Sequence, residues 1–178
     1  MNMLETERLI IRSHIEADWQ DLYEYLSLEQ TYVFEPGKPI SESEARQITA
    51  DRAQGKDFLA VVLKCMHKVI GHLYFHHTEP GEYLTWELGY IFNPEFHNRG
   101  YCTEASRSII VYAFKTLHAH KVVAYCNPLN PASWKVLEKC GMRREGHFLQ
   151  KAFFRRDVNG RPVWHDCYAY GILADRLH

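Results

Sequence analysis

The apolar positions of the N-terminal third predict a strand followed by two helices. Residues 8–12 form a short, mainly apolar run that predicts the strand. Apolar and aromatic residues then recur between Trp19 and Leu26 at positions i, i+3, i+4 and i+7, which is one face of a helix. Ser41-Glu42-Ser43-Glu44 is a capping-box pattern that opens a second helix toward Arg52. The segment Tyr32–Ile40 between them contains two prolines and a glycine, and we expect an exposed loop there.

The middle of the chain predicts three consecutive strands. They cover 58–63, 69–77 and 83–92, with a turn at 79–82 before the third. The third strand alternates between two faces. One face carries Leu84, Trp86, Leu88, Tyr90 and Phe92, and the other carries Thr85, Glu87, Gly89 and Ile91.

After Pro94 the apolar spacing becomes helical again. Residues spaced by four predict a long amphipathic helix: Ala105, Ile109, Ala113 and Leu117. A buried strand follows at 121–126, and Asn130-Pro131 with Gly141 frames a helix of about ten residues. Two last strands flank the turn sequence at 157–160. The order βααβββαβαββ predicts an α/β fold with a mixed sheet, in a single domain covering 1–178.

Composition narrows the function classes. The 178 residues are 46% hydrophobic and 13% aromatic, which excludes a disordered chain. A chain of this length buries roughly 70% of its unfolded surface as one domain. Lys plus Arg is 21 and Asp plus Glu is 22, so the net charge of -1 argues against nucleic acid or an anionic membrane as partner.

The chain also lacks the signals of secretion and metal binding. Its first residues show no basic and apolar signal-peptide regions, and the longest clean apolar run, 58–63, is far shorter than a span of ~20 residues. The five cysteines are odd in number and form no CxxC pair, so we expect reduced thiols and a cytoplasmic location. His76-His77 and His118-x-His120 have no companion ligands at metal spacing, and we expect no metal.

The segment from Glu87 to Ala105 gives the clearest indication of a ligand-binding site. It reads as a strand, a loop and a helix that begins directly after Gly100. The first turn of a helix leaves backbone N–H groups unpaired and carries partial positive charge. Gly100 allows close approach of a ligand and Arg99 adds a charge, so the segment predicts a pyrophosphate site. The alternative is an ordinary strand-to-helix turn that uses a glycine.

This segment resembles the acetyl-CoA signature of the GNAT N-acetyltransferases. The chain as a whole resembles the RimJ/RimL-like branch, which acetylates the N-termini of ribosomal proteins. The matching stretches are Leu4–Arg12, Glu87–Tyr90, Gly100–Ala105, Asn130–Ser133, Lys139–Met142, Glu145-Gly146, and Asn159-Gly160 with Asp166. The chain departs from the pattern at His97, where Gln or Arg is usual, and at Cys102, where Gly or Ala is usual.

The resemblance implies a GNAT fold with helices on both faces and a sheet splayed between the fourth and fifth predicted strands. Acetyl-CoA would lie in that gap as cosubstrate. Its pantetheine arm would bind the backbone of Tyr90, Ile91 and Phe92, together with Asn130 and Ser133. The pyrophosphate would bind the loop residues His97, Asn98, Arg99, Gly100, Tyr101, Cys102 and Thr103.

Two residues are candidates for the chemical step, which the resemblance implies is direct attack of an amine on the thioester. Glu87 lies in an otherwise apolar strand, where a raised pKa would suit a general base near neutral pH. It could instead be a structural carboxylate. Leu137 stands where many relatives carry a tyrosine acid, and Ser133 matches a serine thought to replace it. Ser133 could equally be a second helix cap beside Asn130.

The identity of the acceptor amine is left open by the sequence. Resemblance favours a protein or peptide N-terminus, such as that of a ribosomal protein. The chemistry agrees, because an α-amine has a pKa near 7.7–8.0 against about 10.4 for lysine and is easier to deprotonate. The alternatives are a small-molecule amine acetyltransferase and a CoA-binding module without turnover. A monomer and a homodimer are both compatible with the sequence.

Overall fold

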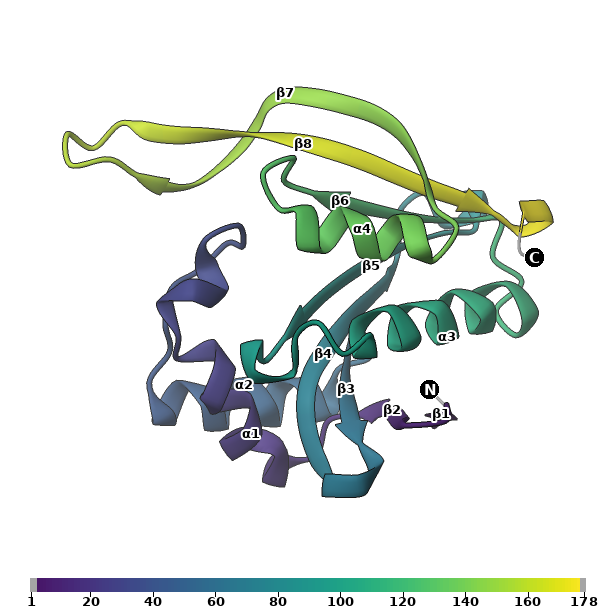
Figure 1. Ribbon diagram of the computed structural model, residues 1–178, viewed down its shortest axis with the longest axis horizontal. Coiled ribbons are helices and arrows are strands. Elements are labelled where there is room, and N and C mark those ends of the chain that lie inside the picture. Colours follow the sequence, from purple (N-terminus) through teal and green to yellow (C-terminus); the bar gives the residue numbers. More distant parts are fainter. Residues whose placement is uncertain (1–2, 177–178) are drawn as a thin grey trace.

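The computed structural model describes residues 3–176, which fold into a sheet with helices on its faces (Figure 1). The strands are β1 (Leu4–Glu5), β2 (Leu9–Ser13), β3 (Phe58–Leu63), β4 (Lys68–His77), β5 (Thr85–Phe92), β6 (Lys121–Cys126), β7 (Arg143–Arg156) and β8 (Pro162–Leu173). The α-helices are α1 (Trp19–Leu26), α2 (Glu42–Gln54), α3 (Tyr101–Lys115) and α4 (Pro131–Lys139). No helix within these described residues is both long enough and apolar enough to cross a membrane.

The strands form one sheet that opens in its middle. Their order is β1-β2-β3-β4-β5-β6-β8-β7, and β5–β6 is the parallel pair in an otherwise antiparallel sheet. The β5–β6 ladder joins only Thr85–Glu87 to Lys121–Val123, after which the two strands separate. This confirms the predicted mixed sheet that splays between the fourth and fifth predicted strands.

Helices cover both faces of the sheet, as predicted (Figure 1). Neighbouring residues of a strand point to opposite faces. On β5, Leu88 is buried in the main core with Ile109 of α3, whereas Ile91 packs with Leu22 and Tyr25 of α1. The helices α3 and α4 therefore lie on one face, and α1 lies on the other.

Three predicted positions are corrected by the structure. The strand predicted at 83–92 begins at Thr85 instead of residue 83, because Leu84 adopts a left-handed backbone (φ 48°) at the end of a 3₁₀ turn. Leu117 lies beyond the end of α3, which stops at Lys115. Tyr25, not Tyr23, is the buried tyrosine of α1, and its hydroxyl lies 2.7 Å from Nδ1 of the buried His72.

Both predicted helix caps are confirmed. Ser41 accepts a hydrogen bond from the backbone of Glu44 and completes a capping box at α2. Asn130 accepts from the backbone N–H of Ser133 at 3.1 Å and caps α4. Because the cap fixes where α4 starts, it also fixes where Ser133 lies relative to the opening between β5 and β6.

The two predicted C-terminal strands form a long hairpin. Strands β7 and β8 extend well past the rest of the sheet to the predicted turn at 157–160 (Figure 1). The carboxylate of Asp157 accepts from the backbone of Asn159 and Arg161, which shapes that turn. Near its base, the hairpin is tied to β6 by an ion pair between Lys121 and Glu145 at 2.5 Å.

Candidate active site

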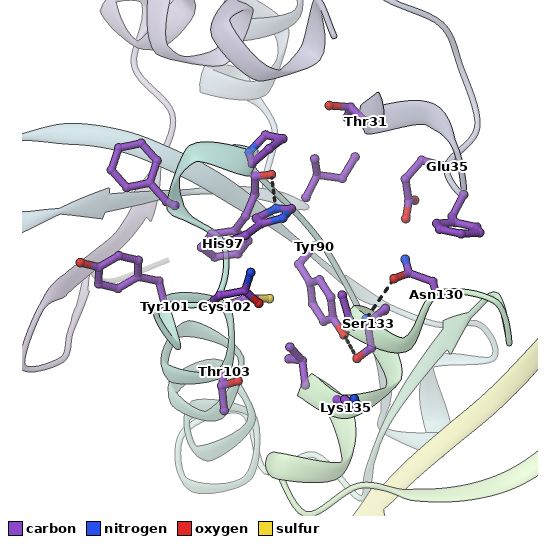
Figure 2. A pocket seen from close by; sticks show the side chains of 18 of the residues that line it. Thr31, Glu35, Tyr90, His97, Tyr101, Cys102, Thr103, Asn130, Ser133 and Lys135 are labelled. Carbon is purple, nitrogen blue, oxygen red and sulfur yellow. Dashed lines mark hydrogen bonds between the residues drawn. The ribbon is translucent and has the colours of Figure 1, made fainter. Parts of the chain in front are cut away.

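A cavity of about 530 Å³ lies where β5 and β6 separate (Figure 2). Its walls come from the end of β5, the β5–α3 loop with the first turn of α3, the start of α4, and the segment between α1 and α2. The predicted cofactor-binding residues that line it are Tyr90, Ile91, Phe92, His97, Asn98, Gly100, Tyr101, Cys102, Thr103, Asn130 and Ser133. The two predicted site residues that lie outside its wall are Glu87 and Arg99.

The β5–α3 loop presents backbone N–H groups to this cavity. Gly100 is the N-terminal flanking residue of α3 and has a left-handed backbone with φ 80°, which glycine adopts without strain. Asn98 is also left-handed, at φ 60°. The first turn of α3, from Tyr101 to Thr103, lines the cavity, so the unpaired N–H groups of a helix start face an open space. This arrangement suits an anion.

Arg99 does not contribute to that space through its side chain. It is exposed, and its guanidinium lies 5.7 Å from the centroid of the Phe96 ring. The ring of His97, in contrast, turns back to the strand, with Nε2 at 3.0 Å from the carbonyl oxygen of Phe92. The positive side chains that line the cavity are instead Lys135 and Lys139 of α4.

Hydrogen bonds from the N-terminal segment fix the start of α3. The Glu104 carboxylate accepts hydrogen bonds from the Thr6 hydroxyl (2.6 Å), the Arg8 backbone (3.0 Å) and Arg8 Nε (2.7 Å). Arg8 also donates to the carbonyl of Arg99 at 3.0 Å and covers the Tyr101 ring. Burial acts to raise the pKa of Glu104, but these hydrogen bonds outweigh it and the pKa is lowered. No pattern in the sequence indicates this contact, because its partners are 96 residues apart.

Tyr90 and Ser133 meet across the opening between β5 and α4 (Figure 2). The Tyr90 hydroxyl donates to the Ser133 carbonyl at 2.9 Å and lies 3.1 Å from Ser133 Oγ. Burial raises the pKa of Tyr90 well above its usual value, so the hydroxyl keeps its proton. From the sequence, only the backbone of Tyr90 is expected to contact a ligand. The structure adds a proton-bearing side chain to the cavity wall.

Glu87 lies on the sheet face opposite Leu88 and is the last residue of β5 that pairs with β6, opposite Val123. It is half-buried and stands directly across from His76 of β4. Burial raises the pKa of Glu87, and the neighbouring His76 opposes that shift. A carboxylate with a raised pKa is suited to take up a proton. Since Glu87 is outside the cavity wall, a proton would have to reach it from the cavity's edge.

A second cavity, of about 540 Å³, opens between the α1–α2 segment and the β7–β8 hairpin. Phe154, Arg155 and His165 form the hairpin side. Three residues line both cavities: Gln30, Val33 and Glu35. The sequence predicts only an exposed loop here and does not single out Glu35, whose surroundings arise from strands more than a hundred residues away.

Comparison with known proteins gives consistent matches. Residues 8–143 match the family model described as an acetyltransferase (GNAT) domain. The chain is 35% identical over 173 residues to the "Uncharacterized N-acetyltransferase YnaD" of Bacillus subtilis (strain 168), covering 97% of each protein. It superposes on the crystal structure of a GNAT-family acetyltransferase from Bacillus anthracis with a TM-score of 0.85 and 33% identity, over 97% of this chain and 99% of that one.

More distant relatives act on two kinds of acceptor. One is the [ribosomal protein uS5]-alanine N-acetyltransferase of Escherichia coli (strain K12), 26% identical over 81% of this chain and 79% of that protein. Another is the spermidine N(1)-acetyltransferase of Vibrio cholerae (strain El Tor Inaba N16961), 25% identical over 89% of this chain and 78% of that protein. Similarity at this level leaves the acceptor of the present chain open.

Proposed function

The chain belongs to the GNAT acetyltransferase family and is an N-acetyltransferase, and we propose that it moves the acetyl group of acetyl-CoA to the α-amine of a protein or peptide N-terminus. The observation that supports this most is the cavity in the split sheet. It combines the first turn of α3, two lysines of α4 and a proton-bearing Tyr90–Ser133 pair. The helix start and the lysines suit the phosphates of a polyanionic thioester. The hydroxyl pair suits the thiolate that leaves when the thioester is cleaved.

Different residues of the cavity wall would bind different parts of acetyl-CoA. Backbone groups of Gly100 to Thr103, with Lys135 and Lys139, would hold the phosphates. The edge of β5 from Tyr90 to Phe92 would bind the pantetheine arm, apart from the Phe92 carbonyl, which His97 already contacts. Asn130 would act indirectly here, since its side-chain oxygen is engaged in capping α4.

In the proposed reaction the neutral amine attacks the thioester carbon. A C–N bond forms, the C–S bond breaks, and the CoA thiolate leaves. The amine nitrogen loses one proton to Glu87, through water, before or during attack. The thiolate gains one proton, which the Ser133 hydroxyl supplies and recovers from solvent. The products are the acetylated amine and free CoA thiol.

Ser133→Ala is expected to lower kcat by about 3- to 10-fold, a small effect for a proton donor because water can partly replace it. The structure favours this role over a capping role, since Asn130 caps α4 and the Ser133 hydroxyl faces Tyr90. Asn130→Ala is the matched control for helix capping. Equal stability loss and full activity in Ser133→Ala would show that the hydroxyl has no part in the reaction.

The acceptor is tested with a panel that includes each alternative. Peptides beginning with Ser or Ala, free or blocked at the N-terminus, are compared with spermidine and aminoglycosides by release of free CoA thiol, and the acetylated atom is mapped by mass spectrometry. We expect acetylation at the free α-amine. Modification of internal lysines in the blocked peptides, or of small amines alone, would assign the chain to another acceptor. No thiol release with any amine would indicate a CoA-binding module without turnover.

A further inference from the structure

The two cavities meet at the segment between α1 and α2. Of the three residues that line both, Gln30 and Val33 are uncharged, so Glu35 is the one ionisable side chain at the junction. Figure 2 shows Glu35 on the α1–α2 side of the first cavity, with its carboxyl group directed toward Asn130. An acceptor that reached the Tyr90–Ser133 pair from the second cavity would pass this carboxyl group.

Glu35 has an unusual environment for a carboxylate in a loop. Burial raises its pKa to about 7, and burial is the only cause of the shift. Within residues 3–176 neither a cation nor a hydrogen-bond donor acts to lower it. Its charge also reaches Cys126 at the end of β6, where it adds to the effect of burial in raising the thiol pKa. Glu35 is partly buried, and a carboxylate withdrawn from water without a partner is costly, so a bound cation would reduce that cost.

We propose that the Glu35 carboxylate binds the ammonium group of the acceptor. The acceptor would enter through the second cavity, and Glu35 would hold its amine where this cavity joins the first, in which acetyl-CoA would lie. This inference rests on the proposed function. It makes Glu35 a specificity-determining residue that holds the amine next to the thioester, while proton removal remains with Glu87. A carboxylate is the natural partner for an ammonium ion, and a charge-assisted hydrogen bond is roughly twice as strong as a neutral one.

The charges around Glu35 restrict which groups the acceptor can carry beyond its ammonium group. The other charged or titratable residues of the second cavity include Glu29, Lys38, Arg155 and His165. On the acetyl-CoA side they include His97, Lys135 and Lys139. Beyond Glu35 the acceptor thus meets at least as many cationic as anionic groups. This suits one ammonium joined to a carbonyl or carboxylate group, as at a peptide N-terminus. Further positive charges, as in a polyamine, would find no excess of carboxylates.

The test compares wild type, Glu35→Gln and the control Glu82→Gln, which changes an exposed carboxylate that lines neither cavity. Initial rates of CoA thiol release are measured against the concentration of a peptide with a free N-terminal Ser or Ala, from pH 6 to 9. We expect Glu35→Gln to raise the acceptor KM by at least ~10-fold with kcat changed by less than about threefold. Glu82→Gln should change the KM by less than about threefold.

The pH profile separates recognition from a structural effect. In the wild type the acceptor KM should fall as pH rises through about 7, because Glu35 ionises there. In Glu35→Gln the fall of the KM that is due to Glu35 should disappear. Titration of the acceptor amine should affect the KM of wild type and variant in the same way. An unchanged thermal shift with acetyl-CoA shows that the variant is folded.

Three kinds of result would overturn the inference. If Glu35→Gln keeps the wild-type KM, or lowers kcat at unchanged KM, Glu35 does not bind the acceptor, although the proposed function stands. If spermidine is used better than the peptide, the acceptor class is wrong. A wild type that releases no thiol with any amine overturns the proposed function and this inference together.

Discussion

Replacing Gly100 with Trp is expected to abolish acetyl-CoA binding. The indole would occupy the space at the start of α3 that the pyrophosphate needs, since Gly100 lines the cavity. A side chain at φ 80° is also strained, at a cost of about 1–2 kcal/mol for a residue other than glycine. The measurement is the thermal shift produced by acetyl-CoA, which should be absent in Gly100→Trp.

Gly160→Trp separates loss of the site from loss of stability. Gly160 has nearly the same backbone, φ 78°, but an added Cβ there would meet no atom within 4 Å. It lies in the hairpin turn and lines neither cavity. Both variants should unfold at a lower temperature without ligand, but Gly160→Trp should keep the full acetyl-CoA shift. Equal shifts in the two variants would place the phosphate site elsewhere.

Glu87→Gln is expected to lower kcat by ~10²-fold, the size of effect typical of losing a general base. Acetyl-CoA affinity should hardly change, because Glu87 lies outside the cavity wall. Burial raises the pKa of Glu87 above its usual value. The carboxylate form needed for proton uptake is therefore lost as pH falls through that raised pKa. The wild-type kcat should fall with it, and this acidic limb should vanish in the variant.

Glu145→Gln is the matched control for that experiment. Glu145 is a partly exposed carboxylate that forms an ion pair with Lys121, and it lines neither cavity. Its loss should leave kcat at saturating acceptor within about threefold of wild type. If Glu87→Gln behaves in the same way from pH 6 to 9, the base is another group or water.

Local features of this fold were predictable because they depend on neighbours in the sequence. Apolar spacing located the helices and strands, and Ser41 and Asn130 located two helix starts, because a cap bonds to residues only a few positions away. The ends of the helices and strands were harder to predict from the sequence. Leu117 continues the helical spacing of α3, although the helix has already ended at Lys115.

The site was predictable only where a single segment forms it. The cavity wall from His97 to Thr103 is one such segment, since a glycine before a helix start carries its own signal. Contacts between segments that are distant in the sequence could not be predicted. Arg8 reaches Glu104 across 96 residues, and Glu35 lines a cavity with Phe154 and His165, which only the folded sheet brings near. The sequence placed Tyr90 on one face of its strand but not its hydroxyl next to Ser133, because periodicity describes which face a side chain takes and not what its hydroxyl meets.

The short ladder between β5 and β6 also bears on how long the protein survives in a cell. It joins the two halves of the sheet through three residues on each strand. A ligand lying between the separated strand ends would brace the halves against each other, and it would bind the folded chain alone. At a hundredfold excess over its Kd, such a ligand adds roughly 2.7 kcal/mol to the free energy of unfolding. The supply of acetyl-CoA would then set the resistance of the enzyme to proteolysis, so that a metabolite level governs enzyme abundance as well as turnover.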